Sequence, residues 1–355
     1  MQIDIVWTQP GCVRGGLLPM CLAFALVVSG CATRCCAQGT VVLVGSGSSV
    51  PAPLFARWSE EYDKRNPAFQ MRYLPVGTSE GIVQFSRGVG DFAAGEVPLT
   101  AKQRADDGLV EIPTVLIAIV PIYNPPGIEG ELCLSGAVLA DIFLGRIKNW
   151  NSPTIVQLNP DLSLPDLSIK AIYRPTGKGS NYVFSEFLSK SSLRFRAQVG
   201  TSPSPAWPVG SAAERSFDMA AKVSAEPGSI GYVEAQYAAK MTIAQAAILN
   251  PAGRFVKASM GSLTAACQAV EAPGFDRLSA SLINAPGAES YPITSFSWLY
   301  LRTNSNSPET GRSQSLAAWL NWMLSSGQRT VTQEGYAVLP APLLAKVKAK
   351  VAPLR

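Results

Sequence analysis

The residues best suited to chemistry in this chain gather in three clusters of Gly, Ser and Thr. The clusters occupy residues 45–49, 77–79 and 176–180, and each follows a short apolar strand and opens a helix. A helix start presents unpaired backbone N–H groups and the positive end of the helix dipole, so it attracts anions. Glycine lets the backbone approach a ligand closely, and hydroxyls add further donors. Three such starts predict the converging walls of an oxyanion-binding site.

Two charged residues stand at strand ends close to these clusters. Arg174 closes the strand predicted over residues 169–174, where its guanidinium can bind an oxyanion through two parallel hydrogen bonds. Glu96 ends a short strand within residues 91–98. A carboxylate accepts a hydrogen bond from an anion that carries a proton and repels a fully ionised one, which predicts a preference for hydrogenphosphate over sulfate. Taken singly, Arg174 also fits a surface salt bridge and Glu96 a solvated strand end.

Several kinds of catalysis and cofactor binding are excluded by residue type. The chain contains no histidine, which rules out Ser-His-Asp and Cys-His catalysis and most zinc sites. Val50 and Pro51 interrupt the first cluster where a dinucleotide-binding loop needs its third glycine, and Lys178 lacks the Ser or Thr that follows it in a phosphate-binding P-loop. We therefore expect a binding protein with no catalytic residue, no metal and no cofactor.

Length and composition indicate a globular protein of two domains. The chain has 355 residues, of which 47% are hydrophobic and 15% are charged. Its net charge of +5 comes without a long basic run, which argues against a nucleic-acid partner.

The N-terminus is typical of a targeting segment. An apolar run over residues 17–28 predicts a signal peptide over residues 1–37. The run itself is too short for a convincing membrane span. Two processing sites compete, because residues 28–31 resemble a bacterial lipobox that would lipidate Cys31, whereas small residues before Gln38 suit simple cleavage. We favour a soluble exported product in the periplasm or outside the cell, with a lipid anchor at Cys31 as the alternative.

Only two cysteines lie outside this N-terminal segment, Cys133 and Cys267. A disulfide between them after export and a pair of buried thiols are both consistent with the sequence.

The apolar pattern after residue 38 alternates between strand and helix, which predicts an α/β fold with mainly parallel sheets flanked by helices. A continuous apolar run over residues 114–120 predicts a strand buried on both faces. Residues 250–290, rich in Ala, Pro and Gly, are expected to be the least regular part. Further strands are expected at 41–44, 71–76, 228–233 and 292–301, and helices after Pro51, from 139 and over 313–326 and 341–351.

Taken together, the clusters resemble the periplasmic phosphate-binding proteins of bacterial phosphate ABC importers. The resemblance covers nearly all of residues 40–345. It rests on motifs in the same order along the chain: GSGSSVPAPLF at 45–55, VGTSEG at 76–81, DFAAGEVPL at 91–99, DIFLGRIKNW at 141–150, GSIGYVE at 228–234 and PITS at 292–295.

The resemblance implies a two-domain, type II clamshell. Lobe I would comprise residues 38–115 plus 291–355, and lobe II residues 116–290, joined by two crossover strands near residues 115 and 291. Dehydrated phosphate would lie between the lobes, and the closed form, expected to be a monomer, would be recognised by the membrane permease of an ABC importer.

The resemblance also implies the residues that bind phosphate. The hydroxyls of Ser49 and Thr78 would donate to the anion, Arg174 would be the single charged clamp, and Glu96 stands where the family usually has Asp. Backbone donors would come from beside Ser49 and from the third helix start. The full set is Ser49, Val50, Thr78, Glu96, Arg174, Lys178, Gly179 and Ser180.

Four positions depart from the family pattern. Glu96 is one methylene longer than Asp, so it must retract or the pocket must be wider. Thr176 replaces the acid beside Arg174, and Glu80 replaces a small Gly. Lys178 replaces a phosphate-binding Ser; pointing inward it would favour a dianion or relax selectivity, and pointing outward it would leave only its backbone N–H.

The sequence therefore predicts a non-enzymatic, exported protein that captures inorganic phosphate for ABC-type import. The alternatives are a binder of another oxyanion or of a small organic phosphate, a secreted phosphatase-like enzyme that works without histidine, and a scaffold or adhesion protein that has lost binding.

Overall fold

The computed structural model describes residues 40–274, 278, 280–303 and 310–352. The expected signal peptide, with Cys31 and both processing sites, lies outside the described residues.

Eight strands form one mixed sheet in the order β2-β1-β3-β11-β4-β8-β6-β7. Neighbours at both ends of this order run parallel, and the pairs that involve β11 or join β4 to β8 run antiparallel. A three-stranded sheet has the order β10-β9-β5. The strands are β1 (Val41–Gly47), β2 (Phe69–Leu74), β3 (Phe92–Gly95), β4 (Leu109–Tyr123), β5 (Cys133–Leu134), β6 (Lys170–Tyr173), β7 (Ser211–Ala212), β8 (Ser229–Glu234), β9 (Ala247–Leu249), β10 (Phe255–Val256) and β11 (Thr294–Arg302).

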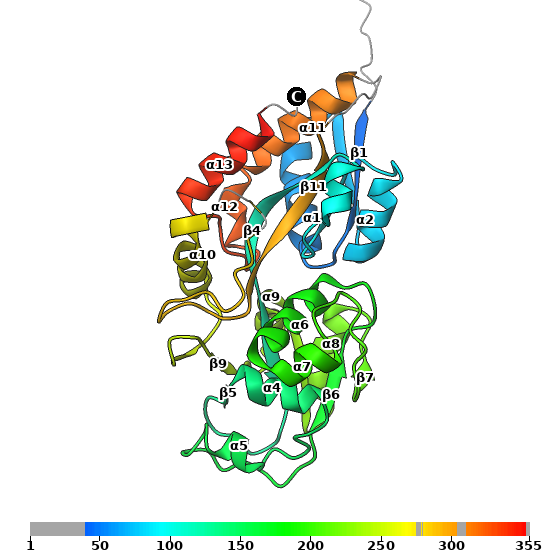
Figure 1. Ribbon diagram of the computed structural model, residues 1–355. Helices are drawn as coiled ribbons and strands as arrows, with labels where there is room; N and C mark the ends of the chain where they lie inside the picture. The colour runs from blue at the N-terminus through cyan, green and yellow to red at the C-terminus, as the bar shows by residue number, and fades with distance from the viewer. Residues whose placement is uncertain (1–39, 275–277, 279, 304–309, 353–355) are drawn as a thin grey trace, which may run out of the picture. The chain divides into compact units, whose positions relative to one another are not determined.

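The long strand β4 joins the two parts of the large sheet, and Figure 1 shows it beside β11. Its first part pairs with β11 as far as Ala118, and its last five residues, from Ile119 onward, pair with β8. The apolar run predicted as a strand lies at its centre, where every side chain is buried. Tyr291 donates its hydroxyl to the carbonyl of Ile119 at 3.0 Å, and the N–H of Ile119 donates to Ile293 at 3.1 Å. The two expected crossover segments are therefore hydrogen-bonded to each other.

Helices flank the sheet, and α1 shows why they form. Leu54, Phe55, Trp58 and Tyr62 are spaced so that they share one face of α1, and all four are buried. The indole N–H of Trp58 donates to the carbonyl of Gly327 at 2.8 Å, which ties this early helix to the C-terminal part of the chain.

The described helices are α1 (Ala52–Asp63), α2 (Thr78–Ser86), α3 (Ala101–Ala105), α4 (Gly136–Phe143), α5 (Pro153–Val156), α6 (Gly179–Ser191), α7 (Leu193–Gln198), α8 (Ser216–Ala225), α9 (Ala235–Lys240), α10 (Met260–Gly274), α11 (Thr310–Met323), α12 (Gln328–Val331) and α13 (Ala341–Val351). None of them combines the length and the apolar character that a membrane crossing requires.

The expectation of irregular structure between residues 250 and 290 was wrong for α10. Its sequence is rich in alanine, a strong helix former, and Leu263, Ala266 and Cys267 are buried. Cys133 on β5 is a free, half-buried thiol, so it forms no disulfide with Cys267.

Candidate anion-binding site

The three predicted helix starts meet in the structure. The N–H of Gly77, before α2, donates to the carbonyl of Gly47 at the end of β1 at 2.7 Å. The N–H of Ser79 donates to the carbonyl of Gly177, before α6, at 3.2 Å. Backbone hydrogen bonds thus link the first cluster to the second and the second to the third, although Ser79 and Gly177 are 98 positions apart in the sequence.

Glycine is required where these segments touch. A Cβ on Gly81 would lie 2.4 Å from the Cα of Gly47, which brings the backbones of α2 and β1 into direct contact. A Cβ on Gly179 would lie 1.9 Å from Oε2 of Glu96 and 2.7 Å from Oγ1 of Thr78. Glu96 directly after β3, Thr78 at the start of α2 and Gly179 at the start of α6 therefore lie against one another.

Three hydroxyl groups surround the carboxyl group of Glu96, which is fully buried directly after β3. Ser297 of β11 donates to Oε1 at 2.9 Å, and Thr78 donates to Oε2 at 3.3 Å. The hydroxyl of Ser48 is a third partner. Glu96 therefore extends to the helix starts rather than retracting, and it engages the hydroxyl of Thr78 that was expected to bind phosphate.

Burial raises the pKa of Glu96 from its usual 4.5 to about 7, because the charged form loses its hydration. The hydroxyls of Ser48, Ser297 and Thr78 act in the opposite direction, and the nearby charge of Glu234 adds to the rise. Near neutral pH this carboxyl group can therefore either donate or accept a hydrogen bond.

Arg174, just after β6, is buried without a carboxylate partner among the described residues. Nη1 donates to the hydroxyl of Ser216 at 2.8 Å, and Nη2 donates to the backbone carbonyl of Glu214 at 2.9 Å. Nε has no hydrogen-bond partner in the described part of the chain. Both hydrogen-bond partners are neutral groups, so the guanidinium has no direct ion pair in the described part of the chain.

Lys178 caps α6, and its side chain turns to Glu214, whose carboxylate lies 2.7 Å from Nζ. Its backbone N–H donates to the carbonyl of Pro203 at 3.1 Å. The side chain therefore does not reach the carboxyl group of Glu96, and the backbone donor expected of this residue is already engaged.

The remaining predicted residues differ in the donors they leave available. Gly179 and Ser180 begin α6, so their N–H groups are among those that lack a partner within the helix. The N–H of Val50 donates to the hydroxyl of Ser48 at 3.1 Å. Ser49 lies beside it, half-buried, in the bend after β1.

Two further residues position the loop of Arg174. The hydroxyl of Tyr232 accepts the N–H of Arg174 at 3.1 Å and donates to Oδ1 of Asn181. The amide group of Asn181 donates to three loop carbonyls, including that of Arg174 at 3.1 Å.

Sequence reasoning named neither of these residues as functional, nor Ser297 and Glu214, and it included Ser48 only as a member of the first cluster. A polar residue inside an apolar strand, as at Ser297, was the available signal.

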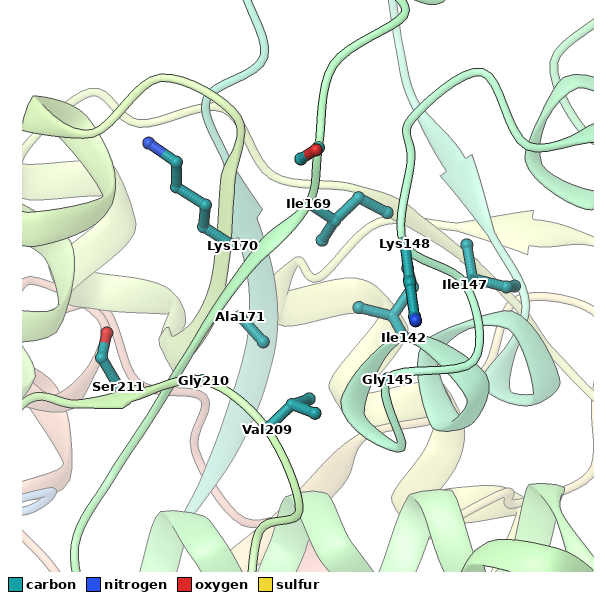
Figure 2. A pocket seen from close by; sticks show the side chains of 11 residues that line it. Ile142, Gly145, Ile147, Lys148, Ile169, Lys170, Ala171, Val209, Gly210 and Ser211 are labelled. Atoms are coloured by element: carbon teal, nitrogen blue, oxygen red, sulfur yellow. The ribbon is translucent and has the colours of Figure 1, made fainter.

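A cavity of about 470 Å³ lies away from this site, between α4, β6 and the segment before β7. Figure 2 shows the apolar side chains of Ile142, Ile169, Ala171 and Val209 facing this space. None of the predicted site residues lines it. Within the described residues, no group of three or more acidic or cysteine side chains could hold a metal ion.

Comparison with known proteins identifies the family. The model of the PBP superfamily domain matches residues 36–326. The phosphate-binding protein PstS of Haemophilus influenzae is 35% identical over 309 residues, which cover 87% of this chain and 92% of that protein. The chain belongs to the PstS family of phosphate-binding proteins.

Solved structures show the same type II binding-protein fold for this PstS family member. A high-affinity periplasmic phosphate-binding protein, PfluDING, solved with bound phosphate, superimposes with a TM-score of 0.68 at 16% identity, covering 86% of this chain and 93% of that one. An ABC-type phosphate transport receptor from Vibrio cholerae superimposes with a TM-score of 0.57 at 16% identity. The match covers 83% of this chain and 99% of that one. The family consists of substrate-binding proteins.

Proposed function

We propose that this protein captures inorganic phosphate and delivers it to an ABC importer, without catalysing a reaction. The proposal rests on the environment of Arg174. Its guanidinium is buried, has no carboxylate partner in the described chain and has an unpaired Nε. It stands beside the start of α6, where Gly179 and Ser180 offer backbone donors. The names of the relatives support phosphate as the anion.

We propose that the anion lies between two lobes, residues 38–115 plus 291–355 and residues 116–290. Strand β4 changes its partner at Ile119, close to the proposed boundary between residues 115 and 116, which supports a division of the lobes along this strand. Closure of the lobes would trap phosphate, and the membrane permease would recognise the closed monomer. Export to the periplasm or beyond, with or without a lipid anchor at Cys31, completes the proposal.

Glu96 would select for an anion that carries a proton. Above pH 7 the ionised carboxylate accepts a hydrogen bond from hydrogenphosphate and repels sulfate. Below pH 7 the protonated carboxyl group can donate to either anion, so the preference for phosphate narrows. The anion must also share the hydroxyl of Thr78 with Glu96 or displace the carboxyl group from it.

Calorimetric titration of phosphate, arsenate, sulfate and a small organic phosphate into the mature protein tests this proposal. We expect phosphate to bind, and sulfate to bind better below than above the pKa of Glu96. Arg174→Ala should abolish binding, whereas Arg57→Ala, which removes a half-exposed arginine of α1 paired with Glu61, should not.

Failure to bind any oxyanion would overturn the proposed function. Turnover of a phosphate ester by the same preparation would support the phosphatase-like alternative instead.

A further inference from the structure

We propose that Glu214 determines anion specificity by neutralising Lys178. The inference rests on the proposed function and concerns a residue outside the predicted phosphate-binding set. In this view the carboxylate of Glu214 holds the ammonium group away from the anion, so that Arg174 is the cation that the anion meets.

The position of Lys178 makes its charge relevant to the anion. Lys178 precedes Gly179 and Ser180, and its side chain is only 17% exposed. A Cβ on Gly77 would lie 3.8 Å from Cδ of Lys178, so the aliphatic stem passes the start of α2. With nothing to hold it, the ammonium group would be within reach of the helix starts that face the anion.

Glu214 contacts the two cations through different atoms. Its side-chain carboxylate lies 2.7 Å from Nζ of Lys178, whereas its backbone carbonyl accepts from Nη2 of Arg174 at 2.9 Å. The second terminal nitrogen of Arg174 is held by Ser216. Replacing the side chain of Glu214 therefore releases Lys178 and leaves both hydrogen bonds of Arg174 in place.

The consequence concerns the choice between anions. Glu96 discriminates by the presence of a proton on the anion, which is a hydrogen-bonding criterion. An uncompensated Lys178 would attract any dianion whether or not it carries a proton, and would partly offset the repulsion of sulfate by Glu96. Glu214 thus preserves the selectivity that Glu96 provides, by neutralising Lys178.

The test is Glu214→Gln, with sulfate and phosphate affinities measured by calorimetry above the pKa of Glu96. We expect sulfate to bind about fivefold or more tightly, with a steeper dependence on ionic strength, because one full charge has been released. Glu226→Gln is the matched control, since it removes the acid of another Lys–Glu pair, Lys170–Glu226 at 3.4 Å, and should leave sulfate affinity unchanged.

The same substitution made in a Lys178→Met background shows whether the gain acts through Lys178. We expect no gain in sulfate affinity there. Glu214→Asp, which keeps the charge but shortens its reach, should give an intermediate gain and provides a second variant if Glu214→Gln does not fold.

Two results would overturn the inference alone, provided that the wild-type protein binds phosphate. One is equal sulfate affinity in Glu214→Gln and Glu226→Gln. The other is a gain that persists without the charge of Lys178. A wild-type protein that binds no oxyanion would overturn the proposed function itself.

Discussion

Burial and hydrogen bonding act against each other on the carboxyl group of Glu96. Full burial disfavours its charged form, whereas the hydroxyls of Ser48, Thr78 and Ser297 stabilise that form. The balance leaves a proton that is gained or lost near pH 7. A single residue is therefore expected to connect anion selectivity to the pH dependence of stability.

Replacing Glu96 by Gln should remove one component of the pH dependence of stability. Between pH 4.5 and about 7 the folded protein holds a proton on Glu96 that the unfolded chain releases. The free energy of unfolding therefore falls as the pH rises through this window, by on the order of 3 kcal/mol once the pH exceeds 7.

Urea unfolding of both proteins across this range gives the difference directly. Wild-type and Glu96→Gln curves that run parallel through the window would contradict the prediction.

At the scale of elements, the site depends on how closely strands and helices approach each other. Strands β1 and β3 end beside the start of α2, and α6 begins against the same point. Such close contact leaves no room for a side chain, so only glycine fits at positions 47, 81 and 179.

Gly81→Ala should destabilise the contact between α2 and β1. The new methyl group would lie 2.4 Å from the Cα of Gly47, a backbone atom that cannot move without moving β1. Overpacking of this kind costs about 1–3 kcal/mol.

Gly311→Ala in α11 is the control, because its added Cβ would meet no other element of the described residues within 4 Å, and alanine favours the helix by up to about 1 kcal/mol. Stability is measured by thermal unfolding. Equal changes in both variants would show that the close contact between Gly81 and Gly47 does not limit the side chain at position 81.

At the scale of the whole molecule, β4 is the element that connects the two parts of the large sheet. Its change of partner occurs at Ile119, which pairs with Glu234 of β8. Glu234 is fully buried, and neither of its carboxylate oxygens has a hydrogen-bond partner within the described residues. A buried polar group without a partner lowers stability, and here it does so where β4 changes its strand partner.

Glu234→Gln should raise the free energy of unfolding by about 1–3 kcal/mol, because a neutral amide costs less to bury without a partner than a carboxylate does. It should also lower the pKa of Glu96, because the charge of Glu234 contributes to raising it. Glu111→Gln is a contrasting control, since the buried Glu111 is paired with Arg104 and its removal should destabilise the protein.

Chemical denaturation of the three proteins distinguishes these effects. A loss of stability in Glu234→Gln would mean that the carboxylate makes a favourable interaction.

Local patterns were sufficient to predict most of the elements. The continuous apolar run over residues 114–120 predicts a strand, which is present as the centre of β4. The spacing of apolar residues after Pro51 predicts a helix, which is present as α1. Helix α10 was missed because its Gly and Pro content and weak periodicity masked a strong alanine propensity.

By itself the sequence determined the three strand–glycine–helix clusters, the positions of Arg174 and Glu96, and membership of the family, because each is encoded by residues close together in the chain. Only the tertiary structure decided which donors are already engaged. Glu96 is hydrogen-bonded to Ser297, which is 201 positions away in the chain, and Lys178 to Glu214, which is 36 positions away. Partners so distant are chosen by how the segments pack, which no local pattern records.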